Sequence, residues 1–312
     1  MTLAEVTAAV THRADVQEAR LRRLGRRFGR PLRDALVIIG LARALLYFGG
    51  PVSIMGVEVG QGIHPWEFLG VDARAYWSVD LAHPYASSGV GVLSTYLYSP
   101  AFAQILAPFS LIPFPVFYAL WTVMLVGIVI WLVRPWPWAL AILALPILYE
   151  LAVGQVHLLI AAAIVVGFAR PAAWALPILT KLTPSIGLLW FAIRQEWRGL
   201  AEAVGVTAAI VVVSFILSPS AWFDWYTFLT SSTERGEALF LRVGVGIVLM
   251  VLAALSGRRW LVPVAIWIAL PVVWIESWVI LLAIIRLGRM PAAASATPGA
   301  TTTALGSTAA PG

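Results

Sequence analysis

The sequence predicts an all-α polytopic membrane protein with about nine to ten transmembrane helices. Of its 312 residues, 61% are hydrophobic and only 12% are charged, and a water-soluble domain could not bury that much apolar surface. A spanning helix needs roughly 20 apolar residues, and apolar runs of about this length fill most of the chain between residues 35 and 287. The chain has no cysteine, which excludes disulfides, thiol nucleophiles and thiolate metal sites.

Residues 1–33 form a basic segment ahead of the first apolar run. This segment contains eight arginines: Arg13, Arg20, Arg22, Arg23, Arg26, Arg27, Arg30 and Arg33. A basic cluster beside a membrane span is typical of a cytoplasmic anchor, so we expect no nucleic-acid partner. The apolar residues at 16, 21, 24, 28 and 32 fall near helical spacing, which predicts an amphipathic helix that lies on anionic membrane lipids.

Residues 34–289 are expected to form one transmembrane domain, followed at 290–312 by a disordered tail rich in Ala, Thr, Pro and Gly. The first span leaves the cytoplasm, so an extracytoplasmic loop follows it, and a second external loop is expected near residue 230. The final run contains Pro271 and Glu276, and two short helices with a turn near "WIES" fit it better than one helix. The expected segments are the first span at 35–54, the loop at 55–96, single spans at 97–111, 116–133, 172–193, 200–217 and 243–255, the second loop at 219–240 and the final run at 260–287.

The region between Arg134 and Arg170 allows two interpretations. Its two short apolar runs, 137–149 and 156–169, are joined by "YELAVGQVH". If both runs span the membrane, Arg134 and Arg170 lie outside, against the usual arginine bias toward the cytoplasm. A re-entrant pair would place the two arginines differently, and the sequence leaves both arrangements open.

An acidic and aromatic stretch, "GVDARAYWSVDLAHPY", stands in the first external loop. Charges in a water-exposed loop cost little, so simple solvation explains Asp80. Asp72 differs because Val71, Tyr76 and Trp77 surround it in sequence, which indicates a half-buried carboxylate. Perturbed carboxyl groups of this kind are typical of functional sites.

The only lysine, Lys181, lies within an apolar run, in "ILTKLTPS". Ionisable groups in spanning segments are costly and generally functional. Pro184 removes a backbone donor and so frees the carbonyl one turn earlier. The lysine either extends its amine to the membrane surface or faces a polar cavity that holds an anion, and we favour the cavity.

Glu150, Gln155 and His157 form a further cluster of polar residues. They are either part of a functional site or present only for hydrogen bonding between helices. The chain contains no nucleotide-binding loop, zinc-protease motif or nucleophile elbow. It also lacks an Asp-x-Asp pair or histidine cluster for a divalent metal. We therefore expect chemistry without a metal or cofactor.

Several motifs together resemble glycosyltransferase family 87, the polyprenyl-phosphate-mannose-dependent α-mannosyltransferases of the C-type integral-membrane fold. The first is an acid followed by tyrosine in the first loop, "DARAY", with "YLYSP" at the start of the next run. "GQVH" is similar to the family's Gly-Gln-x-Asn, and "KLTP" to its intramembrane Lys-x-x-Pro. "PVVWIESW" is similar to a late Pro-x-Ser-Trp element. Two residues depart from the family pattern: His157 stands in place of Asn, and Glu276 in place of His.

The resemblance implies a multi-pass cell-membrane enzyme that moves a sugar, mannose by family precedent, from a polyprenyl phosphate to a lipid or glycan acceptor. The reaction is expected to occur at the extracytoplasmic face with inversion, and Asp72 is the expected general base. The residues expected to bind donor or acceptor are Arg74, Tyr76, Tyr98, Gln155, His157, Lys181, Trp274 and Glu276. Lys181, together with Arg74 or Arg242, would face the departing phosphate, and Tyr76, Tyr98 and Trp274 would frame the sugar.

Two other classes of function remain open. A transporter or lipid flippase is one, although such folds often contain repeated halves and this sequence shows no convincing repeat. A non-catalytic scaffold derived from the enzyme fold is the other, and the substitution at Glu276 is the reason to consider it.

Overall fold

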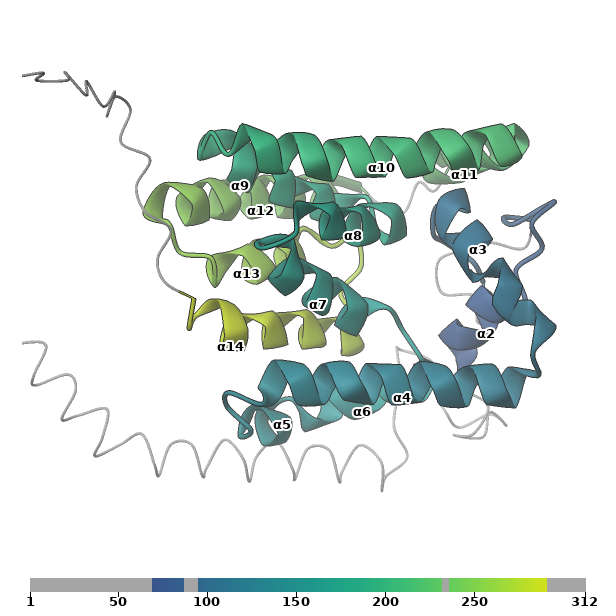
Figure 1. Cartoon of the computed structure of the whole chain (residues 1–312), viewed down its shortest axis with the longest axis horizontal. Coiled ribbons are helices and arrows are strands. Elements are labelled where there is room, and N and C mark those ends of the chain that lie inside the picture. Colours follow the sequence, from purple (N-terminus) through teal and green to yellow (C-terminus); the bar gives the residue numbers. More distant parts are fainter. Residues whose placement is uncertain (1–68, 87–94, 232–235, 291–312) are drawn as a thin grey trace, which may run out of the picture.

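The structure is a computed structural model that describes residues 69–86, 95–231 and 236–290, with side chains described from 239 onward in the last range. Within these ranges every regular element is an α-helix or a 3-10 helix. The expected arginine segment at 1–33, the first span at 35–54 and the tail after Met290 lie outside the described residues. Figure 1 shows α10 (Trp197–Leu217) and α4 (Phe114–Val133) along the longest axis of the molecule, with the other helices largely between them.

Three described helices are long and apolar enough to cross a membrane, or four if one sharply bent pair counts as a span. They are α4 (Phe114–Val133), α10 (Trp197–Leu217) and α12 (Gly236–Ser256). The outer faces of α10 and α12 expose large apolar side chains such as Ile216 and Leu255, as expected for helices that contact lipid. The described residues therefore contain fewer complete spans than the nine to ten that the sequence predicted, because several apolar runs are broken into short helices.

The run at 97–111 does not cross the molecule as expected. It forms α3 (Pro100–Leu106) and the 3-10 helix η2 (Ala107–Leu111), with 7 and 5 residues. Their combined length is about 20 Å, which is short of the roughly 30 Å hydrocarbon layer. Both flanks contact the same short helix α2 (Val71–Trp77): the hydroxyl oxygens of Tyr98 and Tyr76 lie 3.0 Å apart, and Trp77 Nε1 donates to the Ile112 carbonyl at 2.8 Å.

Because that run returns to its starting side, α4 begins beside α2 and ends at the opposite end of the molecule (Figure 1). We call the two ends the Asp72 end, which holds α2 and α3, and the arginine end, which holds Arg134, Arg170, Arg286 and Arg289. The loop expected at 219–240 is largely helical. Its first part is α11 (Pro219–Ser231), at the Asp72 end, where Phe228 stacks on Tyr85 with ring centroids 5.8 Å apart.

The region that the sequence left open forms a re-entrant pair. After the single turn α5 (Ala139–Ile142), α6 (Ala144–Val153) and α7 (His157–Gly167) are bent by 110° at the short break between them. Pro135, before the pair, and Arg170, after it, line the same surface pocket. The chain therefore enters and leaves at the arginine end, which keeps Arg134 and Arg170 on one side.

The run at 172–193 also turns back, where a single span was expected. It comprises η3 (Pro171–Trp174), α8 (Ala175–Thr180), η4 (Thr183–Gly187) and α9 (Leu188–Ile193). Lys181 interrupts it in an extended conformation, with φ −140° and ψ 122°, as the missing N–H of Pro184 favours. Pro171 and Glu196, which flank the run, line one surface pocket.

The final run forms two short helical segments, as predicted. They are α13 (Leu261–Ala269) and the continuous η6 (Glu276–Leu282) and α14 (Ala283–Leu287), separated by the non-helical residues 270–275. Arg259 Nη1 lies 4.0 Å from Met290 Sδ, so this run also begins and ends at the arginine end. The described chain thus contains three hairpins, and the tip of each points away from the arginine end.

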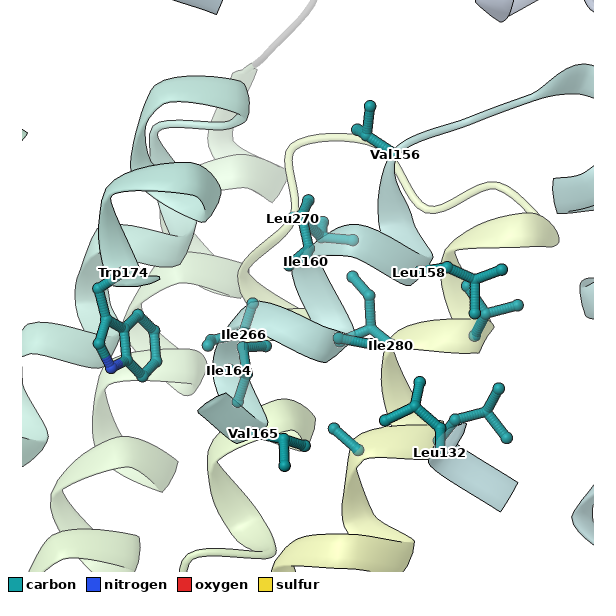
Figure 2. Close-up of a cluster of buried hydrophobic side chains, with 14 of the residues drawn as sticks. Leu132, Val156, Leu158, Ile160, Ile164, Val165, Trp174, Ile266, Leu270 and Ile280 are labelled. Carbon is teal, nitrogen blue, oxygen red and sulfur yellow. The ribbon is translucent and has the colours of Figure 1, made fainter. Parts of the chain in front are cut away.

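The apolar core joins these three hairpins. Figure 2 shows Ile160, Ile164 and Val165 of α7 between Ile266 and Leu270 of the α13 segment and Ile280 of η6. Leu132 of α4 and Trp174 of η3 close the cluster on two sides, and all of these side chains are at most 3% exposed. Close packing of this kind resists rearrangement, so it fixes the positions of the three hairpin tips relative to one another.

Candidate active site

The short helix α2 presents Asp72 and Tyr76 on one face, because residues four apart lie on the same side of a helix. Gly70, in the left-handed conformation at φ 69°, begins the helix, and its N–H donates to the Ala152 carbonyl of α6 at 2.7 Å. Arg74 lies on another face, where its guanidinium is exposed and sits 4.1 Å from the centre of the Phe114 ring.

Gly154 brings the tip of the first hairpin against α2. It caps α6 in the left-handed conformation with φ 75°, which a residue with a side chain adopts only at a cost. A Cβ placed there would lie 2.7 Å from the Cβ of Ala73. Glycine is therefore required at position 154 both by the left-handed turn and by the close approach of α6 to α2. As a result the next residue, Gln155, reaches the face of α2 that holds Asp72.

Gln155 is the centre of a buried hydrogen-bond network. Its Nε2 donates to Asp72 Oδ2 at 3.0 Å. Its Oε1 accepts from the hydroxyls of Tyr76 and Tyr98, at 2.7 and 2.5 Å, and from the Val156 N–H at 2.9 Å. Three donors on one oxygen fix the orientation of the amide, so its NH₂ group faces the carboxylate.

A second network extends from Glu150 to Lys181. Glu150 accepts from the Leu158 N–H at 2.9 Å and lies 3.1 Å from His157 Nδ1. His157 Nε2 lies 2.8 Å from Lys181 Nζ. Since an ammonium group can only donate, Nε2 is the acceptor and the neutral imidazole donates its Nδ1 proton to Glu150. Glu150 and His157 are fully buried.

The two networks meet through electrostatic attraction around Lys181. Its ammonium interacts with the carboxyl groups of Glu276, Glu150 and Asp72. Burial raises the pKa of Asp72 from 3.8 to about 6, and attraction by Lys181 limits that rise. Glu276, at the start of η6, is 3% exposed, and its Oε2 has no hydrogen-bond partner among the described residues.

The structure therefore brings together seven of the nine residues that the sequence singled out: Asp72, Tyr76, Tyr98, Gln155, His157, Lys181 and Glu276. Two others are placed differently. Arg74 points toward Phe114, away from the Asp72 face of α2. Trp274 is half-buried in the loop before η6, and its side chain makes no hydrogen bond or ring contact with the described residues of the cluster.

Glu150 is the residue whose connection to the site sequence reasoning missed. The sequence leaves hydrogen bonding between helices as one explanation of this residue, whereas in the structure its carboxylate contacts the histidine that binds Lys181. The available signal was an acid within an apolar run. Asp80, by contrast, lies in solvent beside His83, with Oδ2 and Nδ1 3.7 Å apart, as expected for a solvated loop residue.

Comparison with known proteins identifies the family. The family model for glycosyltransferase family 87 matches residues 96–308, which is more than half of the chain. The matched region contains Gln155, Lys181 and Glu276, whereas Asp72 precedes it. No curated protein and no solved structure matches the chain. The chain, with its all-helical fold and apolar helices long enough to span a membrane, belongs to glycosyltransferase family 87 and is a membrane glycosyltransferase.

Proposed function

We propose that this glycosyltransferase moves mannose from a polyprenyl phosphate to a hydroxyl group of a lipid or glycan acceptor at the extracytoplasmic face, with inversion and without a metal. The observation that carries the proposal is the meeting of the Asp72 carboxylate and the Lys181 ammonium within one partly buried polar cluster. The two groups supply a base and a positive charge, which are what displacement of a phosphate-linked sugar requires.

Asp72 is suited to act as the base. Among the described residues only Gln155 donates a hydrogen bond to the carboxylate, and it uses Oδ2. Oδ1 is thus able to accept the proton of an acceptor hydroxyl. With a pKa of about 6, the group is mostly ionised at neutral pH and more basic than an ordinary aspartate, which favours general-base catalysis.

Lys181 is suited to stabilise the leaving group. Its ammonium donates a hydrogen bond to His157 Nε2, and Glu150 fixes the orientation of that histidine. In the proposed step the acceptor oxygen bonds to the anomeric carbon and Asp72 takes the proton. The bond from that carbon to the phosphate oxygen breaks, and the electron pair leaves on the polyprenyl phosphate. Lys181 neutralises the charge that develops there.

The position of the site supports a lipid-linked donor. Helix α2, which holds Asp72, lies beside the start of α4 at one end of this candidate membrane span (Figure 1), and Tyr98 and Gln155 are joined to α2 by hydrogen bonds. A donor whose sugar phosphate stands on an isoprenoid chain would present the sugar at that depth while its tail remained in the bilayer. Mannose, and the extracytoplasmic orientation, follow from the family resemblance and the arginine distribution.

The test is transfer by purified protein in liposomes that contain radiolabelled polyprenyl-phosphate mannose, or the corresponding pentose donors, with membrane lipids as acceptors. Wild type should transfer mannose in the presence of a chelator, and Asp72→Asn should lose about 100- to 10,000-fold of the rate. Asp80→Asn, which changes an exposed acid in the same region, is the matched control and should retain activity.

Transfer that survives Asp72→Asn would contradict the proposed base. A folded wild type that uses no donor would favour the non-catalytic scaffold instead.

A further inference from the structure

The arginine end contains a surface pocket that the proposed reaction does not use. It has a volume of about 500 Å³ and is lined by Arg170, Arg286 and Arg289 together with Trp131, Pro135 and Met290 and neighbouring apolar residues of α7. These residues come from α4, from the segment after α7 and from the end of the chain's last hairpin. Three cationic side chains from two segments thus converge on one hollow with apolar walls.

Two of the guanidinium groups are already held in position. Arg286 donates from Nε and Nη2 to the Trp131 carbonyl, at 2.8 and 2.5 Å, and its Cζ lies 4.3 Å from the centre of the Trp131 ring. Arg289 donates to the Pro135 carbonyl at 2.5 Å. A guanidinium has five N–H donors in a rigid fork, so both groups keep donors for a ligand and lose little conformational freedom when they bind one.

The positive charge of the pocket is not balanced by the protein. Among the residues that the structure describes, no carboxylate lies within 4.0 Å of Arg170, Arg286 or Arg289. A fourth arginine, Arg134, adds electrostatic repulsion on Arg286. Like charges held this close favour binding of an anion, and arginine is well matched to the paired oxygens of a phosphate.

The pocket lies at the depth of lipid headgroups. Helix α4 has 20 residues, or about 30 Å, which equals the hydrocarbon thickness of a typical bilayer. Its last residue, Val133, lies between Trp131 and Pro135, which both line the pocket. Trp136 and Trp138, which follow, are 42% and 45% exposed, as is typical of tryptophans at a membrane surface.

We propose that this pocket binds the phosphodiester headgroup of an anionic phospholipid in the leaflet opposite the Asp72 end. The phosphate would accept hydrogen bonds from Arg170, Arg286 and Arg289, while the apolar wall of Trp131 and Met290 would contact the glycerol and upper acyl chains. A free phosphate ion would use the arginines but gain nothing from that wall. Basic pockets between membrane helices bind anionic headgroups by the same combination of contacts.

The experiment measures lipid binding by the full-length protein in neutral detergent. Dioleoyl phosphatidylglycerol or dioleoyl phosphatidylcholine is titrated, bound lipid is counted by native mass spectrometry, and the unfolding temperature is followed by tryptophan fluorescence. Wild type should retain phosphatidylglycerol preferentially and unfold at a higher temperature with it. The double variant R170Q/R289Q should bind it roughly 25- to 30-fold more weakly, since each arginine near an anionic headgroup contributes about fivefold.

The matched control is Arg258→Gln, an exposed arginine at the same end but outside the pocket, which should bind phosphatidylglycerol as wild type does. If the double variant does not fold, Arg170→Glu provides a second test, because the Arg170 side chain makes no hydrogen bond with the described residues; it should also lose the lipid preference. Equal binding of both lipids by wild type, or unchanged binding by these variants, would overturn the proposal. Equal stabilisation by inorganic phosphate at the same concentration would also overturn it, because it would indicate a site for a free anion.

Discussion

Gln155 donates a hydrogen bond of 3.0 Å to the carboxylate of Asp72, although the two residues stand 83 positions apart in the chain. The same amide accepts hydrogen bonds from two tyrosine hydroxyls and a backbone N–H. The carboxylate of Asp72, the proposed base, is therefore held by the Gln155 amide, whose own orientation is fixed by three other hydrogen bonds.

Replacement of Gln155 by leucine should lower kcat/KM for sugar transfer by about 10- to 100-fold. The change removes the donor that positions Asp72 and leaves the Tyr76 and Tyr98 hydroxyls without their acceptor, and small misplacements of a reacting group cost rates of this size. The control is Gln104→Leu, which removes an amide that donates to the Ser214 carbonyl elsewhere. Equal effects of the two variants would show that Gln155 has no special part in the site.

Replacement of Gly154 by alanine should lower the unfolding temperature and the activity together. The new Cβ would meet Ala73 in a backbone conformation that alanine adopts only with strain, for a combined cost of at least about 1–3 kcal/mol. Gly127→Ala is the matched control, because a Cβ at Gly127 of α4 meets no atom within 4 Å and alanine favours the helix. Both variants are compared by thermal unfolding in the same detergent; a stable Gly154→Ala would contradict the close packing of α2 on α6.

Replacement of Lys181 by methionine should lower the transfer rate about 100- to 1,000-fold, the usual effect of removing one group that stabilises charge in the transition state. It should also move the acidic limb of the pH–rate profile upward, because attraction by Lys181 lowers the pKa of Asp72. Lys181→Arg keeps the charge and should leave that limb near its wild-type position. If the acidic limb does not move in the methionine variant, Lys181 does not influence the pKa of Asp72 and the prediction is wrong.

The wild-type rate should depend on pH through Asp72. With a pKa of about 6, the carboxylate is protonated as the pH falls through 6 and can no longer accept a proton. We expect kcat/KM to be level above this value and to fall about tenfold per pH unit below it. A profile that stays level to pH 5 in liposomes would rule out Asp72 as the base.

The same shift predicts an effect on stability with the opposite sign. The folded-state pKa of Asp72 lies above its unfolded value, so the folded protein binds the proton more tightly and the ionised carboxylate destabilises it. The stabilisation is complete below pH 3.8 and lost as the pH rises through about 6. Asp72→Asn should therefore unfold at a higher temperature than wild type at pH 8, by up to about 3 kcal/mol in free energy, and the difference should shrink at pH 5. A less stable variant at pH 8 would show that Asp72 serves the fold.

The sequence by itself determined the helical membrane class and the two short helices of the last run, and it singled out most of the residues that the structure brings together around Lys181. Composition alone requires lipid as solvent, and an acid or lysine in an apolar run stands out because its burial is costly. The motifs around Gln155 and Lys181 also indicated the family, which the match over residues 96–308 confirms.

Only the tertiary structure decided which apolar runs turn back. The runs at 97–111 and 172–193 have the composition of spans, but proline, the extended backbone at Lys181 and packing against α2 break them into short helices. Hydropathy measures how strongly a segment prefers lipid or the protein interior over water. It does not indicate whether the chain reverses direction within the membrane. Contacts between residues distant in sequence decide that, and they placed Glu150 in the site, turned Arg74 away from it and gathered the arginines at the opposite end.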